Sequence, residues 1–161
     1  MHQAVLLIGG NLGDRRQLIQ QTHGMLSGLG AIKASSGMYE TQAWGKASVG
    51  KYLNQALLLE TLHSPTALLQ LTQEIEDTLG RTRDRRWGDR TMDIDIIYFD
   101  DLIYQDERLI LPHPLMSERN FVLVPLVEIM PDFIHPVFKV SNKELLRRCQ
   151  DAGQVEKYHK V

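Results

Sequence analysis

Four apolar segments, separated by turn-forming residues, predict the strands of a buried sheet. Residues 4–9 (AVLLIG) form a continuous apolar run that ends in glycine, and residues 32–39 alternate between apolar and polar positions. Residues 52–61 (YLNQALLLET) and 92–99 (MDIDIIYF) are two further runs of strand type. A weaker pairing of two short strands is expected around residues 102–111.

Apolar positions spaced by three and four residues predict two helices between these strands. The first covers residues 15–29, where Asp14 is a typical N-cap residue and Gly30 suits the end. The second begins at Ser64, whose neighbour is a proline that the first helical turn accepts, and it runs to about residue 79.

The C-terminal third also reads as helical. A helical segment is expected between the proline-rich elbow 112–114 and about residue 130. Ser141 and Glu144 have the spacing of a capping box, which predicts a last helix through residue 148.

The order of these elements predicts the fold class. Strand, helix, strand, strand, helix and strand follow one another along the N-terminal part, which is the split βαβ pattern of ferredoxin-like folds. We therefore expect an α+β protein with helices packed on a mostly antiparallel sheet. Its 161 residues contain no internal repeat or low-complexity linker, so one domain over residues 1–161 is expected.

Composition narrows the class of partner. Hydrophobic residues make up 43% of the chain, and the formal net charge is -2, which argues against a general nucleic-acid or membrane binder. A single cysteine, Cys149, cannot form an internal disulfide, and neither a signal peptide nor a membrane-spanning run is visible. We expect a cytoplasmic protein that acts on small molecules, as a monomer.

Asp93 and Asp95 carry the strongest chemical signal. They are separated by one residue in an apolar strand, so both carboxylates should face one side while Ile94, Ile96 and Tyr98 face the other. Their Cα atoms should lie about 6.6 Å apart. Two carboxylates at that distance repel each other unless a cation lies between them, and Mg²⁺ prefers such oxygen ligands. The alternative is a pair of aspartates at a solvated strand end.

Arginines gather just before this strand. Five of the eleven arginines fall within residues 81–90, at Arg81, Arg83, Arg85, Arg86 and Arg90. The planar, always-charged guanidinium group matches phosphate oxygens, so a loop with this composition can neutralise a triphosphate. Trp87 could cover the site or anchor the loop. A charge run of this kind is otherwise a solvated surface.

Three weaker signals lie elsewhere. Residues 9–14 (GGNLGD) join a strand to a helix but lack the lysine and the spacing of known phosphate loops, so these glycines are expected to allow a tight turn or a close approach of ligand. Gln73 and Glu76 share a helix face other than the apolar one. His113 stands between two prolines, where a functional and a structural role are equally open.

Motifs along nearly the whole chain are similar to those of one family. Residues 86–97 (RWGDRTMDIDII) match its central signature, and further matches are LLIGGNLGD, YLNQALLLET, QEIEDTLGR, RLILPHP and ERNFVLVPL. With these motifs the chain resembles the 6-hydroxymethyl-7,8-dihydropterin pyrophosphokinases of folate biosynthesis.

The resemblance implies an ATP-dependent diphosphotransferase that moves the two terminal phosphates of ATP as one unit, giving AMP and the pterin diphosphate. It implies that Asp93 and Asp95 bind two Mg²⁺ ions and that Arg81 and Arg90 assist the transfer. The ATP-binding residues it implies are Gln73, Glu76, Arg83, Trp87, Arg90, Ile96, Arg108, Leu109, Ile110, His113 and Arg119. The pterin-binding residues it implies are Gly9, Thr41, Trp44, Tyr52, Asn54 and Phe121, with the ring between Tyr52 and Phe121.

Two other functions fit parts of the pattern. A nucleotidyltransferase also combines a glycine motif with a DxD strand, but there the two lie close in sequence. An RNA-binding module on a ferredoxin-like sheet would need exposed aromatic residues on its central strands. Here the central strand carries acidic residues, which repel phosphate without a metal.

Overall fold

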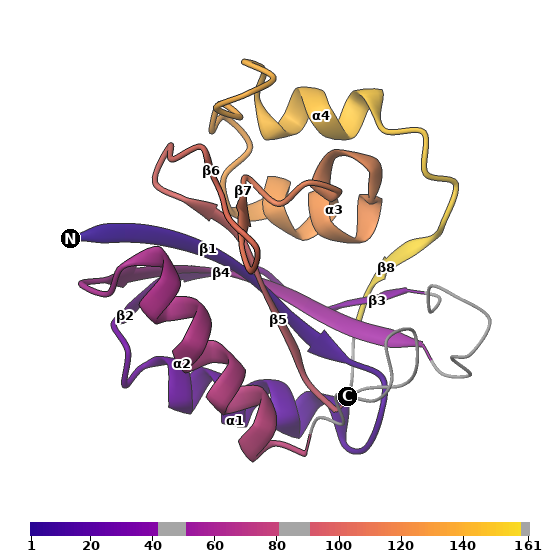
Figure 1. Ribbon diagram of the computed structural model, residues 1–161. Helices are drawn as coiled ribbons and strands as arrows, with labels where there is room; N and C mark the ends of the chain where they lie inside the picture. Colours follow the sequence, from indigo (N-terminus) through magenta and orange to yellow (C-terminus); the bar gives the residue numbers. More distant parts are fainter. Residues whose placement is uncertain (42–50, 81–90, 159–161) are drawn as a thin grey trace.

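The structure of the chain is a computed structural model that describes residues 1–41, 51–80 and 91–158. A six-stranded sheet forms its centre (Figure 1). The strands of this sheet are β1 (His2–Gly10), β2 (Ala31–Ser35), β3 (Tyr39–Thr41), β4 (Tyr52–Thr61), β5 (Asp93–Phe99) and β8 (Val155–Lys157). Their order is β5-β1-β4-β3-β8, with β2 also paired to β4, and every pairing is antiparallel.

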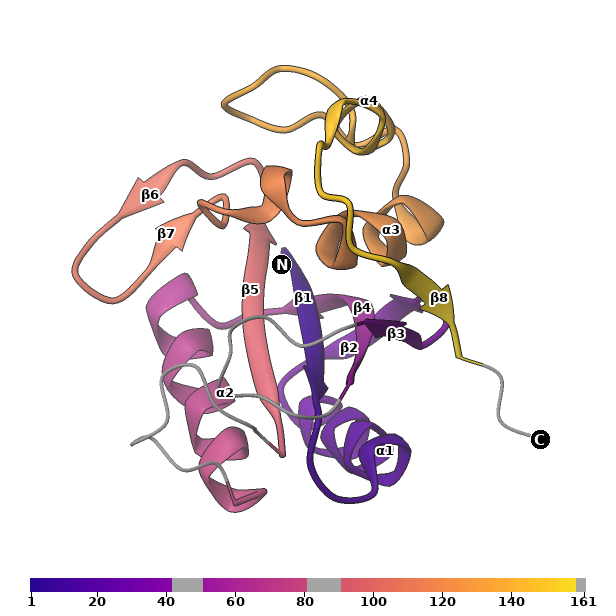
Figure 2. The ribbon, with the colours of Figure 1, turned by 90° about the vertical axis from the view of Figure 1, so that its right-hand side faces the viewer.

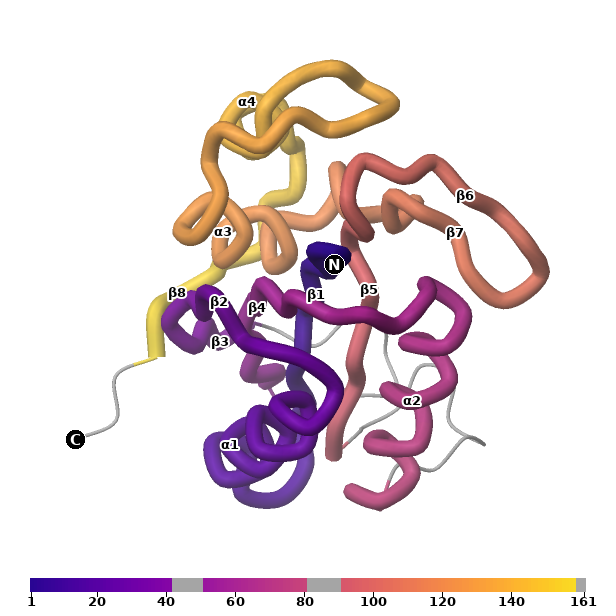
Figure 3. The backbone as a smooth tube through the Cα atoms, turned by 90° about the vertical axis from the view of Figure 1, so that its left-hand side faces the viewer, coloured from indigo at the N-terminus to yellow at the C-terminus, as the bar shows by residue number. Residues whose placement is uncertain are grey.

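Helices cover both faces of the sheet. On one face lie α1 (Arg15–Leu26) and α2 (Pro65–Thr78), and on the other lie α3 (Asn120–Ile129) and α4 (Asn142–Arg148) (Figures 1 and 2). A small hairpin of β6 (Tyr104–Gln105) and β7 (Ile110–Leu111) and a 3-10 turn, η1 (Met116–Glu118), follow β5. Figure 3 shows the hairpin reaching out beside the end of α2. The expected α+β class with a ferredoxin-like, mostly antiparallel sheet is confirmed.

The period-two alternation of the strands divides the core in two. Leu6, Ile8 and Leu57 are buried among the side chains of α1 and α2. Val5 and Ala56 are buried on the opposite face, against α3. Because alternate side chains of a regular strand face opposite sides, this division indicates the face of the other strand residues wherever the pairing has no bulge.

The helix starts expected from the sequence are confirmed by their caps. The side chain of Asp14 accepts a hydrogen bond from the Gln17 N–H at 3.1 Å, and that of Ser64 accepts one from the Ala67 N–H at 3.2 Å. Ser141 accepts from the Glu144 N–H at 3.1 Å. Each cap satisfies a backbone donor that the first turn of a helix leaves without an internal partner.

The strand expected over residues 32–39 is wrong, because two strands occupy this range. Residues 36–38 separate β2 from β3, and the side chain of Ser36 accepts a hydrogen bond from the Ala56 N–H at 3.0 Å. The Gln55 amide also donates to the Ser36 carbonyl at 2.6 Å. These side-chain bonds replace part of the regular ladder, so β2 and β3 pair with different stretches of β4.

Two helix ends also differ from expectation. The first helix stops at Leu26 rather than Leu29, because the chain tightens into a turn in which the Leu29 N–H donates to the Leu26 carbonyl at 2.8 Å. The helical segment before residue 130 is divided into η1 and α3, since Arg119 between them is extended. Within the residues that the structure describes, no helix is long and apolar enough to cross a membrane.

Candidate active site

The two aspartates of β5 lie on the α3 face of the sheet, side by side along the strand. Asp95 is opposite Leu7 of β1, and Asp93 is opposite Gly9. Leu7 is buried in the α3 cluster, so the carboxylates share that face as the alternation predicted. Both are partly exposed, which leaves them within reach of a ligand.

The expectation that Tyr98 faces the same side as Ile94 and Ile96 is wrong. The pairing of β5 with β1 shifts at one point: Leu6 is opposite Ile96, whereas Val5 is opposite Tyr98. Ile97 is therefore the extra residue of a bulge, which turns Tyr98 to the α3 face. There its hydroxyl donates to the Asn142 Oδ1 at 2.6 Å, which ties the strand to α4.

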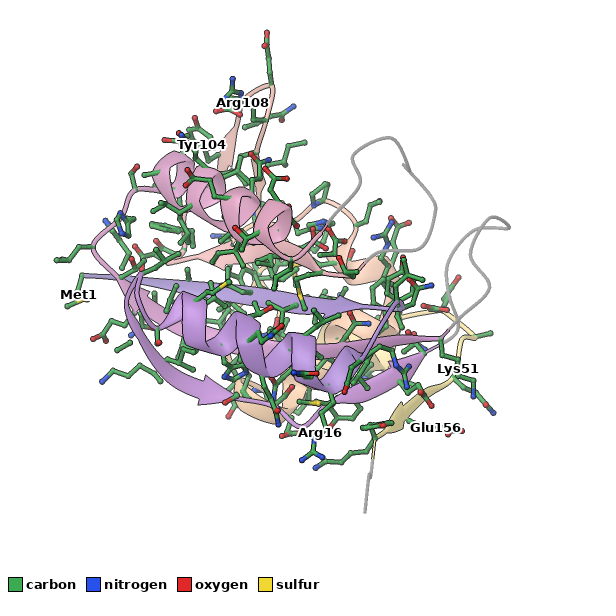
Figure 4. All side chains as sticks on the ribbon, turned by 90° about the horizontal axis from the view of Figure 1, so that it is seen from below. Met1, Arg16, Lys51, Tyr104, Arg108 and Glu156 are labelled. Carbon is green, nitrogen blue, oxygen red and sulfur yellow. The ribbon has the colours of Figure 1, made fainter. Side chains whose placement is uncertain are left out.

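A cavity of about 240 Å³ opens beside Asp95, between β5, α2 and the β6–β7 hairpin. Six residues that the resemblance assigned to the site line it: Asp95, Ile96, Arg108, Leu109, Ile110 and His113. Arg108 belongs to the hairpin, next to α2 (Figure 4). Segments that are distant in the sequence thus meet at one cavity with aliphatic walls and polar groups at its edge.

His113 is held in its neutral form at this cavity. Burial lowers its pKa to about 4, the nearby positive charge of Arg119 acts in the same direction, and the charge of Asp93 opposes them. Its backbone N–H donates to the Ile97 carbonyl at 2.9 Å, and its Nδ1 accepts from the Leu115 N–H at 3.3 Å. An imidazole that accepts at Nδ1 carries its proton on Nε2, so His113 offers a neutral donor.

Glu76 lies on the core side of α2, which corrects the expectation that it and Gln73 share a face away from the core. Only 2% of Glu76 is exposed, whereas Gln73 is half-buried. The Glu76 Oε2 accepts a hydrogen bond from the Ile94 N–H at 2.7 Å. Because β5 is an edge strand, its outward N–H groups need partners, and Glu76 supplies one between the two aspartates.

The proposed pterin residues of the sheet share the α3 face with the aspartates. Gly9 is opposite Asn54, and Thr41 is opposite Tyr52. A Cβ added at Gly9 would overlap both the Asn54 side chain and the Leu53 carbonyl, so the sheet requires glycine there.

Phe121 approaches this face from α3. It packs against the core cluster beneath that helix, and the guanidinium group of Arg119 lies over its ring, 5.7 Å from the centroid. The ring of Phe121 is therefore held by packing against this cluster, with a cation over one of its faces.

Five of the predicted site residues lie outside the described part of the chain. They are Trp44, Arg81, Arg83, Trp87 and Arg90. Their roles, and the loops expected over 42–51 and 81–90, remain predictions, because the structure describes neither 42–50 nor 81–90.

Leu69, Ile94 and Pro114 also line the cavity, although sequence reasoning did not select them. A signal existed for two of them. Leu69 lies four residues before Gln73 on one helix, and such residues share a face. Pro114 follows His113 directly. Ile94 carried no such signal, because its place on the opposite face from the aspartates suggested core alone.

A carboxylate pair beside a cavity with arginine, histidine and aliphatic walls is the arrangement expected of an α+β enzyme of phosphate transfer. Comparison with known proteins identifies the particular group. The chain belongs to the 7,8-dihydro-6-hydroxymethylpterin-pyrophosphokinase (HPPK) family, whose model matches residues 5–131.

Curated relatives agree over most of the chain. A 2-amino-4-hydroxy-6-hydroxymethyldihydropteridine pyrophosphokinase of Bacillus subtilis is 44% identical over 128 residues, which cover 78% of this chain and 77% of that protein. The pyrophosphokinase of the same name from Methylorubrum extorquens is 40% identical over 136 residues, which cover 83% of this chain and 86% of that protein.

Two longer proteins also match this chain, one in structure and one in sequence. A crystal structure of Plasmodium falciparum HPPK-DHPS superposes with a TM-score of 0.71 at 16% identity, over 91% of this chain and 44% of that longer chain. The folic acid synthesis protein FOL1 of Dictyostelium discoideum is 37% identical, and the match covers 93% of this chain but 23% of that protein.

Proposed function

We propose that the cavity and the α3 face of the sheet form one site, at which the terminal pyrophosphate of ATP passes to the hydroxymethyl group of 6-hydroxymethyl-7,8-dihydropterin. The products are AMP and the pterin diphosphate, a step in folate biosynthesis. One observation carries this proposal: Asp95 lines the cavity and also faces the side of the sheet that bears Gly9 and Asn54. The two substrates can therefore meet at the carboxylate pair.

ATP occupies the cavity in this proposal. Ile96, Leu109 and Ile110 provide apolar walls for a flat base, and their backbone groups can read its edge. Arg108 and Arg119 supply positive charge for the phosphates, and His113 donates from a neutral ring. Glu76 acts through the strand that carries the aspartates, and the remaining ATP contacts are Gln73, Arg83, Trp87 and Arg90.

Asp93 and Asp95 hold the metal in this proposal, as two Mg²⁺ ions. The donor set fits, because Mg²⁺ is commonly held by one or two carboxylates together with phosphate oxygens. When bound, the metal neutralises the phosphates and lowers the pKa of the attacking hydroxyl. The chain's own contribution is to hold two carboxylates on one face of a strand that is anchored on both sides. Arg81 and Arg90 add charge to the transferred group.

The pterin lies on the α3 face. Tyr52 and Phe121 offer aromatic rings for its two sides, and Asn54 and Thr41 offer polar groups for its hydrogen-bonding edge. Asn54 and Thr41 are each 6% exposed, and such buried polar groups discriminate strongly between ligands that satisfy them and ligands that do not. Gly9 permits the close approach of Asn54, and Trp44 completes the set.

We propose that the protein acts as a monomer and as one catalytic domain over residues 1–161, since its length and lack of an internal repeat fit one domain. ATP as co-substrate and a lone cysteine suit the cytoplasm.

The test is ³¹P NMR of the protein with Mg·ATP and 6-hydroxymethyl-7,8-dihydropterin. We expect AMP and a pterin diphosphate to appear in equal amounts, with no free pyrophosphate or ADP as primary product. Release of pyrophosphate with a nucleotide joined to the acceptor would indicate nucleotidyl transfer instead. The absence of any turnover would refute the proposal.

A further inference from the structure

Arg15 joins three segments at the end of the sheet where Thr41 and Tyr52 lie. Its Nη2 contacts the Glu40 Oε2 at 2.7 Å, and its Nη1 donates to the Lys51 carbonyl at 2.9 Å. The guanidinium group also lies 5.6 Å from the centroid of the Tyr158 ring. These partners belong to β3, to the residue before β4, and to the C-terminal segment after β8.

The partners of Arg15 immediately precede two of the proposed pterin residues. Glu40 precedes Thr41, and Lys51 precedes Tyr52. Thr41 and Tyr52 are themselves opposite each other in the antiparallel pair of β3 and β4. One guanidinium group therefore contacts the residue that precedes Thr41 and the residue that precedes Tyr52. It links the two segments that carry these proposed pterin residues.

Arg15 is well suited to hold two acceptors at once. It is the first residue of α1, directly after the capping Asp14, so its backbone position is set by the start of the helix. Its side chain is 22% exposed and that of Glu40 is 24% exposed, so water screens the pair only partly. A guanidinium group addresses two acceptors through a rigid fork, which a lysine ammonium cannot do in the same way.

The positive charge of Arg15 also lies beside a pair of like charges, which it can partly neutralise through its contact with Glu40. In the pairing of β3 with β8, Glu40 is directly opposite Glu156. Like charges opposite each other destabilise an antiparallel pair. Figure 4 shows Glu156 and Lys51 at the same end of the molecule. The backbone N–H of Tyr158 donates to the Met38 carbonyl at 2.8 Å, so β8 closes this edge of the sheet.

From these contacts we infer that Arg15 is a positioning residue for the pterin substrate. It keeps β3 and β4 at the separation and register that bring Thr41 and Tyr52 to one ligand. This inference rests on the proposed function, because it presumes that the pterin binds on that face. It adds a residue outside the binding contacts, on a different helix from those that line the ATP cavity.

The experiment compares Arg15→Met with Arg16→Met. Arg16 is the exposed neighbour on the same helix, labelled in Figure 4, so its replacement controls for the lost charge. Titration calorimetry measures pterin binding in the presence of a non-hydrolysable Mg·ATP analogue, and analogue binding alone. We expect Arg15→Met to weaken pterin binding roughly tenfold, the effect of losing a charge-assisted hydrogen bond, with analogue affinity changed by less than about twofold. Arg16→Met should match wild type for both ligands.

Two further variants separate positioning from general stability. Arg15→Lys keeps the charge but loses the fork, so its pterin affinity should lie between those of wild type and Arg15→Met. If Arg15 acts partly through Glu40, adding Glu40→Gln to Arg15→Met should weaken pterin binding by less than the sum of the two single effects. Arg15→Lys and the single variant Glu40→Gln keep long polar side chains, so they remain informative if Arg15→Met fails to fold.

The outcomes distinguish the inference from the function on which it rests. Wild-type protein that does not bind the pterin would refute the proposed function itself. Wild-type binding with unchanged pterin affinity in Arg15→Met would refute only the role of Arg15. Equal losses for pterin and analogue, together with a lowered melting temperature, would show that Arg15 merely stabilises the fold.

Discussion

Asp95 is the residue on which both halves of the candidate site depend. It lines the cavity proposed for ATP, and it shares the α3 face with Asp93 and Gly9 on the side proposed for the pterin. Among the described residues of β1, β4 and β5, only Asp95 combines these two positions with a carboxylate.

Replacing Asp95 with Ala is expected to lower turnover by at least about 10²-fold, the scale of losing one aligned group that stabilises charge in the transition state. Folding should survive, because a repulsive pair of carboxylates is relieved. Steady-state kinetics at saturating Mg²⁺ measures the effect, with Asp101→Ala in the exposed turn after β5 as control. Near-normal turnover of Asp95→Ala would show that the metal assignment is wrong.

Phe121→Ala tests the aromatic side of the pterin site. A flat heterocycle stacked on this ring should lose roughly 1–3 kcal/mol of binding free energy when the ring is removed. ATP affinity should change much less, since Phe121 does not line the cavity. Calorimetric titration of each ligand measures both effects. Equal losses for the two ligands would mean that Phe121 serves only to pack α3.

Gly9→Ala tests the close approach of β1 and β4. The added Cβ would overlap the Asn54 side chain and the Leu53 carbonyl, so we expect a loss of about 1–3 kcal/mol in the free energy of unfolding, as for other overpacked sites. Gly24→Ala is the matched control, because its Cβ meets open space in α1 and should stabilise by about 0.5–1 kcal/mol. Urea denaturation measures the free energy of unfolding of both variants. Equal changes in Gly9→Ala and Gly24→Ala would contradict the requirement for glycine at position 9.

At the scale of elements, β5 is an edge strand that is hydrogen-bonded to a side chain of α2. The Glu76 carboxylate accepts from the Ile94 N–H between the two aspartates, at 2.7 Å. The ATP cavity lies between the same helix and strand. The position of the carboxylates therefore depends on a bond between two elements rather than on β5 alone.

Glu76→Ala is expected to leave the Ile94 N–H buried without this acceptor, which costs about 1–3 kcal/mol of stability and raises the Mg²⁺ concentration needed for half-maximal activity. Glu76→Gln keeps an acceptor oxygen and should stay near wild type in both respects. Glu74→Ala, exposed on the same helix, is the control. If Glu76→Gln also loses ATP affinity strongly, the carboxylate contacts the nucleotide rather than only supporting the strand.

For the whole molecule, the two proposed substrate sites adjoin at one pair of carboxylates. A Mg·ATP complex at Asp93 and Asp95 would neutralise charge at the edge of the pterin face. The occupancy of one site should therefore change the affinity of the other, and by linkage the two changes must be equal.

We expect a non-hydrolysable Mg·ATP analogue to tighten pterin binding by at least about fivefold, the lower end of common coupling energies. Calorimetric titration of the pterin with and without the analogue measures the factor, and the reverse titration must return the same value. In Asp95→Ala the coupling should shrink. Identical pterin affinities with and without the analogue would exclude this coupling, although the separate sites could still be correct.

Local chemistry in the sequence determined most of the fold of this protein and the central feature of its site. Strands β1, β4 and β5 follow from apolar runs, and the caps at Asp14, Ser64 and Ser141 follow from residues within three positions of each helix start. The shared face of Asp93 and Asp95 follows from the period of a strand. These features depend on neighbours in the chain, so a single sequence is enough to predict them.

Only the tertiary structure decided the features whose partners are distant in the chain. The bulge that turns Tyr98 appears in the pairing with β1, Glu76 is buried because β5 needs an acceptor, and Ser36 interrupts a strand by bonding to Ala56. Arg15 acquires its role from Glu40 and Lys51. Hydrophobic period and side-chain type do not specify which distant backbone group a polar side chain will meet. That choice is made when the sheet and its helices assemble, because a buried donor or acceptor must then find a partner.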